Sequence, residues 1–226
     1  MSLPSTEPTS LRRYASKTAD ERREERRRRM LTAALGLFGT QGYRGTTIEA
    51  LCAAASVSTR NFYEEFGSRE ALVIALHDDV NARALKAVIA ALDNLEPSDI
   101  LARVSAATRA YFDVMTSDRR WAQIALVESV GVSPDAEAHR RAAIDRFVTL
   151  IEAEASRLAY TGLIERRDYH LTAVALAGAL NGLINTWTAN NNWNDTVPQI
   201  ADEATRLILL ALTANPSAPT SPAAAR

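Results

Sequence analysis

Four hydrogen-bonding side chains lie close together near residue 60 of this 226-residue chain: Thr59, Arg60, Asn61 and Tyr63. Phe62 and Phe66 of the same segment stand four residues apart, which is the spacing of the buried side of a helix. An arginine can form two hydrogen bonds with guanine in the DNA major groove, and an asparagine can do the same with adenine. The segment therefore has the chemistry of a DNA-reading helix, although many short surface helices carry similar residues.

A second helix is expected directly before this segment. Thr46 and Glu49 have the Ser/Thr-x-x-Glu spacing of a capping box, which predicts a helix that starts at Thr46. Apolar residues then recur every three or four positions until Ser56-Val57-Ser58, where two serines around one apolar residue predict a turn. Ser58 can cap the helix that follows. Two short helices joined by such a turn form a helix-turn-helix.

The residues on both sides extend this pattern. The stretch ALGLFGTQGYRGTT reads as the apolar end of a helix, a glycine-rich turn and a threonine cap, and FGSREAL reads as a glycine stop, a serine cap and a new helix. In this order, residues Thr18 to Val80 resemble the DNA-binding domain of the TetR family of bacterial transcription regulators. Ser56 stands where that family usually has glycine, because the residue often takes a positive φ angle, at a cost on the order of 1 kcal/mol for serine. Arg69 stands where the family more often has lysine.

The predicted DNA-contacting residues come from these two helices and from the start of the next one: Thr46, Thr47, Ser58, Thr59, Arg60, Asn61, Tyr63 and Arg69. We expect Arg60 and Asn61 to touch base edges or the adjacent phosphates. Thr47 and Tyr63 are expected to hold phosphates, which position a protein on DNA without reading its sequence. The expected partner is therefore a double-stranded DNA operator.

A basic segment precedes the helix-turn-helix. Residues 12–29 hold nine basic and four acidic side chains, although the whole chain has a net charge of −1. Residues 1–17 lack apolar periodicity and are expected to form a flexible arm whose basic side chains can reach DNA phosphates: Arg12, Arg13 and Lys17. The alternative is a solvated helix surface, because Thr18 and Glu21 form another capping box and glutamates stand four residues before arginines in this run. The sequence supports the two interpretations equally.

Composition and motifs argue against several other classes of protein. The chain is 47% apolar and 23% charged, and no run of apolar residues reaches the length of a membrane span. Its N-terminus lacks the apolar centre of a signal peptide, so a cytoplasmic location is expected. The three histidines have no metal-site spacing and no catalytic motif occurs, so we predict no enzyme activity and no cofactor. The lone Cys52 is expected to be a small core residue.

Two other functions stay open when the residues alone are considered. The chain could be a helical protein that binds a small molecule without touching DNA, or a membrane-surface protein that uses its basic amphipathic start. A DNA-shift assay with the chain's own upstream region separates these alternatives from a regulator.

The chain is predicted to be all-α, with two domains. A first helix should run from about Ala19 to Phe38 and end at the glycines that follow: Gly39, Gly42 and Gly45. With the two short helices it would form a three-helix DNA-binding domain over residues 18–80. A helix capped by Ser68 should continue an apolar stripe toward Leu92 and connect this domain with a larger helical one over residues 81–214.

The larger domain shows helical periodicity throughout. Ser133-Pro134-Asp135 predicts the start of a long helix that ends at Gly162. The last two helices are expected over residues 167–189 and 195–214, and they are apolar on more than one side. The tail, residues 215–226, is expected to be disordered.

A second copy of the chain is the natural partner for the broad apolar surface of the last two helices. Small residues there permit close helix approach: Ala173, Ala177, Gly178 and Gly182. The family resemblance likewise implies a homodimer through these helices. The alternative is a deeply buried helical hairpin in a monomer.

The resemblance also implies a regulator that responds to a ligand, most often a repressor that leaves a palindromic operator when an apolar small-molecule effector binds. Activation is the less common output in the family. The candidate effector-binding residues are aromatic and soft side chains of the middle helices, although residues of this kind are more often plain core than ligand contacts: Tyr111, Phe112, Met115, Trp121, Phe147 and Trp187.

Overall fold

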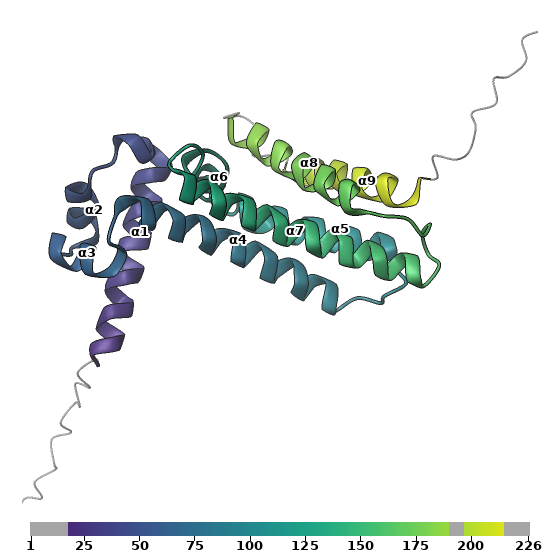
Figure 1. The fold of residues 1–226 in the computed structure, drawn as a ribbon, viewed down its shortest axis with the longest axis horizontal. Helices are drawn as coiled ribbons and strands as arrows, with labels where there is room; N and C mark the ends of the chain where they lie inside the picture. Colours follow the sequence, from purple (N-terminus) through teal and green to yellow (C-terminus); the bar gives the residue numbers. More distant parts are fainter. Residues whose placement is uncertain (1–17, 190–196, 215–226) are drawn as a thin grey trace, which may run out of the picture.

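The computed structural model describes residues 18–189 and 197–214, and every regular element within these ranges is a helix (Figure 1). The predicted all-α class is therefore confirmed. The order is α1 (Ala19–Gly45), α2 (Ile48–Ala55), α3 (Thr59–Phe66), α4 (Arg69–Asp93), α5 (Ile100–Thr116), α6 (Arg119–Gln123), a π-helical turn η1 (Ile124–Glu128), α7 (Pro134–Tyr160), α8 (His170–Ala189) and α9 (Val197–Thr213). The predicted arm with Arg12, Arg13 and Lys17, the helix start at residue 195 and the tail from residue 215 lie outside the described residues.

The first helix starts as predicted but ends later. Thr18 and Glu21 form the capping box, with each side chain bonded to the backbone N–H of the other residue. The helical run is broken only at Gly42, where φ is 78°, and not at Gly39. Gly39 lies instead under Arg120 of α6, where a Cβ atom would come within 2.7 Å of the arginine side chain. This glycine permits close helix packing and does not stop the helix.

The core of the N-terminal unit combines apolar residues from α1 to α4. It contains Met30, Ala34, Leu35 and Phe38 of α1, Leu51, Cys52 and Ala55 of α2, Phe62 and Phe66 of α3, and Leu72, Val73 and Leu76 of α4. Leu35 is buried, whereas Leu37 two residues later is half-buried. Cys52 is a buried free thiol, as expected, and burial raises its pKa.

Helix α4 connects this unit with the larger one. Ser68 caps it by accepting a hydrogen bond from the Ala71 N–H at 3.0 Å. Its buried residues up to Leu76 belong to the N-terminal core, whereas those from Val80 onward belong to the second core. Figure 1 shows α4 running from the α1–α3 end along the length of the larger helical unit. A displacement of α4 would therefore move side chains in both cores.

The larger unit is assembled from α4 to α9. Helix α7 starts at the predicted Ser133 cap with Pro134 in its first turn, and it ends before Gly162, whose φ is 76°. Helix α8 starts at His170 and not at the predicted residue 167, and the Asp168 carboxylate accepts the N–H of this first helical residue at 2.8 Å. No helix in the described ranges is long and apolar enough to cross a membrane.

Candidate DNA interface and ligand cavity

Helix α3 is the helix that the sequence predicts to read DNA, and we call it the recognition helix. Its cap and its apolar side fix its position. Ser58 Oγ accepts the Asn61 N–H at 3.2 Å, so its hydroxyl is used within the helix start. Phe62 and Phe66 are buried in the N-terminal core. The helix consequently exposes Thr59, Arg60 and Tyr63, as the sequence pattern predicts.

Arg60 is highly accessible, with 86% of its side chain exposed. Its Nε donates to the Glu64 carboxylate at 2.7 Å, and this hydrogen bond raises the pKa of Arg60. An exposed pair of this kind contributes little to stability, so Arg60 can exchange Glu64 for a base or a phosphate at small cost. Glu64 was not singled out in the sequence, although its position four residues after Arg60 was a visible signal.

Asn61 faces outward less than predicted. Its side chain is half-buried and lines a shallow cleft between α1 and α3, together with Arg23, Arg26 and Glu65. The reason is helical geometry, because residue 61 directly precedes buried Phe62 and turns toward α1. Asn61 therefore lies beside the arginine-rich part of α1.

Part of the arginine-rich run is used inside the protein. Arg23 Nε and Arg27 Nη1 donate to the Glu65 carboxylate at 2.9 and 3.2 Å, and the Arg27 guanidinium lies 4.7 Å from the centroid of the Phe66 ring. These contacts join α1 to the recognition helix across about forty residues of sequence. Arg23 and Arg27 thus make contacts between helices, which neither the arm nor the solvated-helix interpretation of this run predicted.

The start of α2 differs from the prediction by one residue. Thr47, not Thr46, is the cap, and its hydroxyl accepts the Ala50 N–H at 3.2 Å. The Thr46 side chain is 0% exposed and donates to the Gly42 carbonyl at 2.8 Å. Thr46 therefore cannot contact DNA in this conformation, and its place among the predicted contacts was wrong. Thr47 is exposed.

Arg69 is likewise a bracing residue. Its guanidinium donates to the Thr46 carbonyl oxygen and lies 4.4 Å from the centroid of the Tyr43 ring. Tyr43 in turn packs on Phe38 at 5.5 Å between ring centroids, as a packing residue of the turn should. Arg69 holds the segment between α1 and α2 from the start of α4, and its side chain is half-buried, so its DNA contact stays a prediction.

The turn between α2 and α3 has the predicted backbone geometry. Ser56 adopts φ 52° and ψ 50°, the left-handed region that the family usually assigns to glycine. Its N–H donates to the Ala53 carbonyl, and its own carbonyl accepts from Arg29 Nη1 at 3.3 Å. Hydrogen bonds on both sides of the residue offset the cost of placing serine there.

The π-helical turn η1 lies between the two cores. Ile124 belongs to the N-terminal core, whereas the next residue, Ala125, belongs to the second core. The Glu128 carboxylate accepts the backbone N–H of Tyr43 at 2.7 Å and the Gln123 amide at 2.8 Å. Because Glu128 and Tyr43 are 85 residues apart, no local sequence pattern indicates this contact.

A cavity of about 90 Å³ lies inside the larger unit, between residues of α4, α5, α7, α8 and α9. Tyr111 and Phe147 line it, with their ring centroids 5.4 Å apart. The other four predicted pocket residues do not line it: Phe112, Met115, Trp121 and Trp187. Phe112 is core because consecutive helical residues point about 100° apart, so Phe112 and Tyr111 face different neighbours. Trp121 packs under the Arg83 guanidinium, 3.9 Å from its ring centroid.

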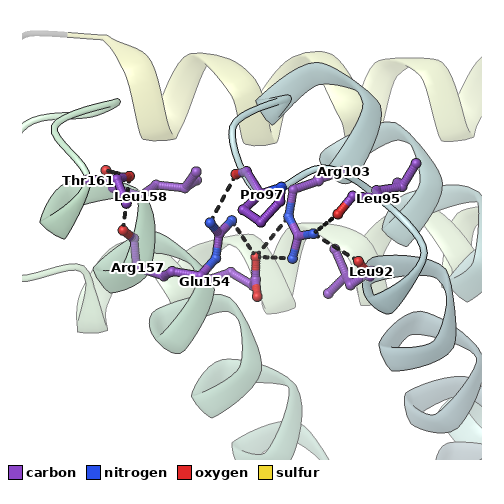
Figure 2. Close-up of polar contacts among 8 residues, drawn as sticks. All are labelled: Leu92, Leu95, Pro97, Arg103, Glu154, Arg157, Leu158 and Thr161. Atoms are coloured by element: carbon purple, nitrogen blue, oxygen red, sulfur yellow. Dashed lines mark hydrogen bonds and ion pairs between the residues drawn. The ribbon is translucent and has the colours of Figure 1, made fainter.

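The polar residues at the cavity wall are mostly bonded to one another. Tyr111 Oη donates to the Asn181 side chain at 2.9 Å, and burial raises the Tyr111 pKa. Arg103 donates to the backbone carbonyls of Leu92 and Leu95 and to the Glu154 carboxylate, as Figure 2 shows. Burial alone would raise the pKa of Glu154, but hydrogen bonds from Arg103 and Arg157 outweigh it and hold this pKa below its usual value.

The candidate dimer surface lies on α8. Ala173 and Ala177 pack against Val148 of α7 within the same protomer, so these two predicted small residues are internal. Gly178 and Gly182 are exposed, and a Cβ atom added at either glycine would meet nothing within 4 Å. On the same helix, 78% of Leu171 is exposed.

Comparisons with known proteins agree with this arrangement. Residues 30–76 match the family model of bacterial regulatory proteins of the tetR family. None of the curated proteins compared with the chain matches it.

Solved structures resemble the chain over most of its length. The transcriptional regulator FadR from Bacillus subtilis in complex with stearoyl-CoA has a TM-score of 0.71 at 13% identity, and the match covers 82% of this chain and 97% of FadR. A regulatory protein of the tetR family from Rhodococcus RHA1 has a TM-score of 0.64 at 21% identity, over 83% and 95% of the two chains. AibR in complex with isovaleryl coenzyme A and operator DNA has a TM-score of 0.62 at 21% identity, over 80% and 96%.

Proposed function

We propose that this chain is a repressor of the TetR family of bacterial transcriptional regulators. It binds a palindromic operator as a homodimer, and it leaves that operator when an effector binds in the cavity of its larger unit. The observation that carries the proposal is the combination of a capped recognition helix with exposed Thr59, Arg60 and Tyr63 and an apolar cavity in the same chain.

The recognition helix supports the DNA-binding part of the proposal. Arg60 can reach a guanine edge or a phosphate, while Asn61 lies beside the basic surface of Arg23 and Arg26. Thr47 and Tyr63 flank them with hydroxyl groups that can bond phosphates. Among the related structures, AibR carries operator DNA, which agrees with this assignment.

The exposed surface of α8 supports the homodimer. Leu171, Val174, Gly178 and Gly182 follow each other at helical spacing on its exposed side. Exposed apolar and small residues in one stripe are what a self-complementary helix interface needs, because they bury apolar area and let backbones approach. Two recognition helices held in one dimer could then engage half-sites about 34 to 36 Å apart.

The size of the cavity suggests how an effector acts. An engineered protein cavity of about 150 Å³ binds benzene, so a cavity of about 90 Å³ must widen to take most metabolites. Val88 and Leu92 of α4 are part of its wall, and α4 starts directly after the recognition helix. A widened cavity would displace α4 and, through it, the spacing of the two recognition helices in the dimer.

The related structures with bound ligands agree with an effector of partly apolar chemistry. FadR holds stearoyl-CoA and AibR holds isovaleryl coenzyme A. Both ligands attach a hydrocarbon chain to a larger polar group, and a hydrocarbon chain suits the apolar side chains that line the cavity here.

A DNA-shift assay tests the proposal. The full chain is mixed with its own upstream region and with a set of other genomic fragments, with the Arg60→Ala variant as a control for recognition. We expect a shift of at least one fragment that the variant weakens, and reversal of the shift by a cell extract fraction that contains small molecules. If no fragment shifts, the better interpretation is a helical protein that binds a small molecule and does not bind DNA.

A further inference from the structure

Thr108 lines the cavity, and its buried hydroxyl group has no hydrogen-bond partner. Thr108 belongs to α5 and is 3% exposed, and its Oγ1 atom is buried. A buried hydroxyl without a partner is unfavourable, because the group gives up its bonds to water and gains none. Its position in the wall means that a molecule inside the cavity could supply the missing partner.

Other buried threonines in the helices do not share this property. Thr188 of α8 and Thr205 of α9 each donate to the backbone carbonyl four residues earlier, at 2.8 Å in both cases. Thr116, which is also in α5, does the same with the Phe112 carbonyl at 2.8 Å. The helix thus offers Thr108 the same internal partner, the Val104 carbonyl, but Thr108 does not use it.

The other polar groups of the wall are already engaged. Tyr111 donates to Asn181, and Arg103 is held by Glu154 and two backbone carbonyls (Figure 2). Glu154 accepts from both Arg103 and Arg157. An ionised ligand group in this cavity would therefore find no free opposite charge, and an unpaired charge is far more costly to bury than a neutral oxygen.

We propose that the effector occupies the cavity with an uncharged part, a hydrocarbon chain or ring that carries one neutral oxygen bonded to Thr108. A ketone, ester or thioester carbonyl would accept the Thr108 proton, and a ligand hydroxyl could donate to or accept from Oγ1. Any ionised group of the effector lies outside the cavity. This inference rests on the proposed function, since it assumes that the cavity is the effector site.

Matched ligands and matched variants test it. The full-length wild type, Thr108→Val and Thr205→Val are titrated by calorimetry with hexane, 2-hexanone and hexanoate, which share the same six-carbon chain. Valine has the shape of threonine without the hydroxyl, so Thr108→Val removes only the proposed partner. Thr205→Val removes a buried hydroxyl that is already bonded within the protein.

We expect the wild type to bind 2-hexanone about fivefold more tightly than hexane, as one added neutral hydrogen bond provides, and to bind hexanoate most weakly. Thr108→Val should abolish the preference for the ketone, whereas Thr205→Val should keep it. An unchanged ketone preference in Thr108→Val, tighter binding of hexanoate than of 2-hexanone, or no binding of any of the three would overturn the proposal.

The melting temperature of the ligand-free protein provides a second readout. Thr108→Val should raise it by about 2 to 4 °C, because an unpaired buried hydroxyl is removed, whereas Thr205→Val should lower it. A lower melting temperature for Thr108→Val would mean that its hydroxyl is paired and would overturn the inference. DNA shift assays with 2-hexanone keep the two proposals apart: ketone-selective binding without operator release would count against the proposed function alone.

Discussion

Glu128 of the π-helical turn holds the backbone N–H of Tyr43 with a 2.7 Å hydrogen bond, and this bond joins the larger unit to the turn just before the helix-turn-helix. Gly42 makes the approach possible, since a Cβ atom there would lie 3.3 Å from the same carboxylate. The position of the helix-turn-helix relative to the cavity therefore depends on η1 as well as on α4.

Replacing Glu128 with alanine should destabilise this junction. The substitution leaves the Tyr43 N–H without its partner, which should lower the free energy of unfolding by about 1 to 3 kcal/mol and weaken operator binding. Chemical denaturation and a DNA-shift titration measure the two effects. Gln123→Ala is the matched control, because it removes the other bond to Glu128 and leaves that to Tyr43 intact. Equal effects of the two variants would mean that the hydrogen bond from Tyr43 to Glu128 contributes no more to stability or operator binding than the bond from Gln123.

Gly39→Ala should be destabilising, although alanine is the better helix residue. The added methyl group would lie 2.7 Å from Arg120 Cβ and Cγ and 3.3 Å from its Cα, so α1 and α6 must separate, at a cost of about 1 to 3 kcal/mol. Gly36→Ala is the control within the same helix, because its new Cβ atom would meet only the end of the Arg120 side chain at 4.0 Å. The free energy of unfolding of Gly36→Ala should rise by up to about 1 kcal/mol. Thermal unfolding measures the stability of both variants relative to the wild type. A stabilised Gly39→Ala variant would contradict the close packing of α1 against α6.

These two contacts mark the limit of what the sequence could predict. Helix starts at Ser58, Ser68 and Ser133 were predictable because a cap acts on N–H groups only two or three residues away. The contact between Glu128 and Tyr43 was not, because it depends on how distant helices pack. Gly39 illustrates the difference, since a glycine at a helix end and a glycine under a neighbouring helix look the same in sequence.

The candidate sites show the same division. The exposed side of α3 followed from the four-residue spacing of Phe62 and Phe66, whereas the α2 cap moved from Thr46 to Thr47 because two adjacent threonines compete for one role. Tyr111 lines the cavity, but aromatic residue type alone also selected Phe112, which faces the core.

Arg60→Ala should weaken operator binding by about 1 to 3 kcal/mol and leave the fold intact, because the side chain is 86% exposed and its removal creates no cavity. Binding titrations against the operator and against operators with single base changes measure both affinity and sequence preference. Glu64→Ala is the control, since it frees Arg60 from its exposed partner and should not weaken binding. Unchanged operator affinity in Arg60→Ala would refute its assignment as a DNA contact.

Glu154→Gln should have an effect on stability that depends on pH. The pKa of Glu154 is lowered in the folded protein, so its carboxylate stabilises the fold above the ordinary glutamate pKa of about 4.3, and this contribution disappears as the pH falls through the lowered value. The variant should be less stable by about 2 kcal/mol near neutral pH, because Arg103 loses a charged partner. The difference from the wild type should narrow below about pH 4. Urea denaturation at these pH values measures the difference in the free energy of unfolding between the wild type and Glu154→Gln. A difference that does not change with pH would contradict an ionised Glu154 paired with Arg103.

Gly182→Leu should show whether the protein is a homodimer that uses α8 or a stable monomer. In the isolated protomer the position is open, and leucine has a higher helix propensity than glycine, so the fold of each copy should be at least as stable as before. In a dimer that packs this side of α8 against a second copy, the added side chain overfills the contact, which costs about 1 to 3 kcal/mol.

Ala142→Leu, at an exposed position of α7, is the matched control. Sedimentation velocity at low protein concentration should show more monomer for Gly182→Leu than for the control. Operator affinity should fall with it, because separate copies lose the gain from two linked half-site contacts. Identical sedimentation of the two variants would place the dimer contact away from Gly182.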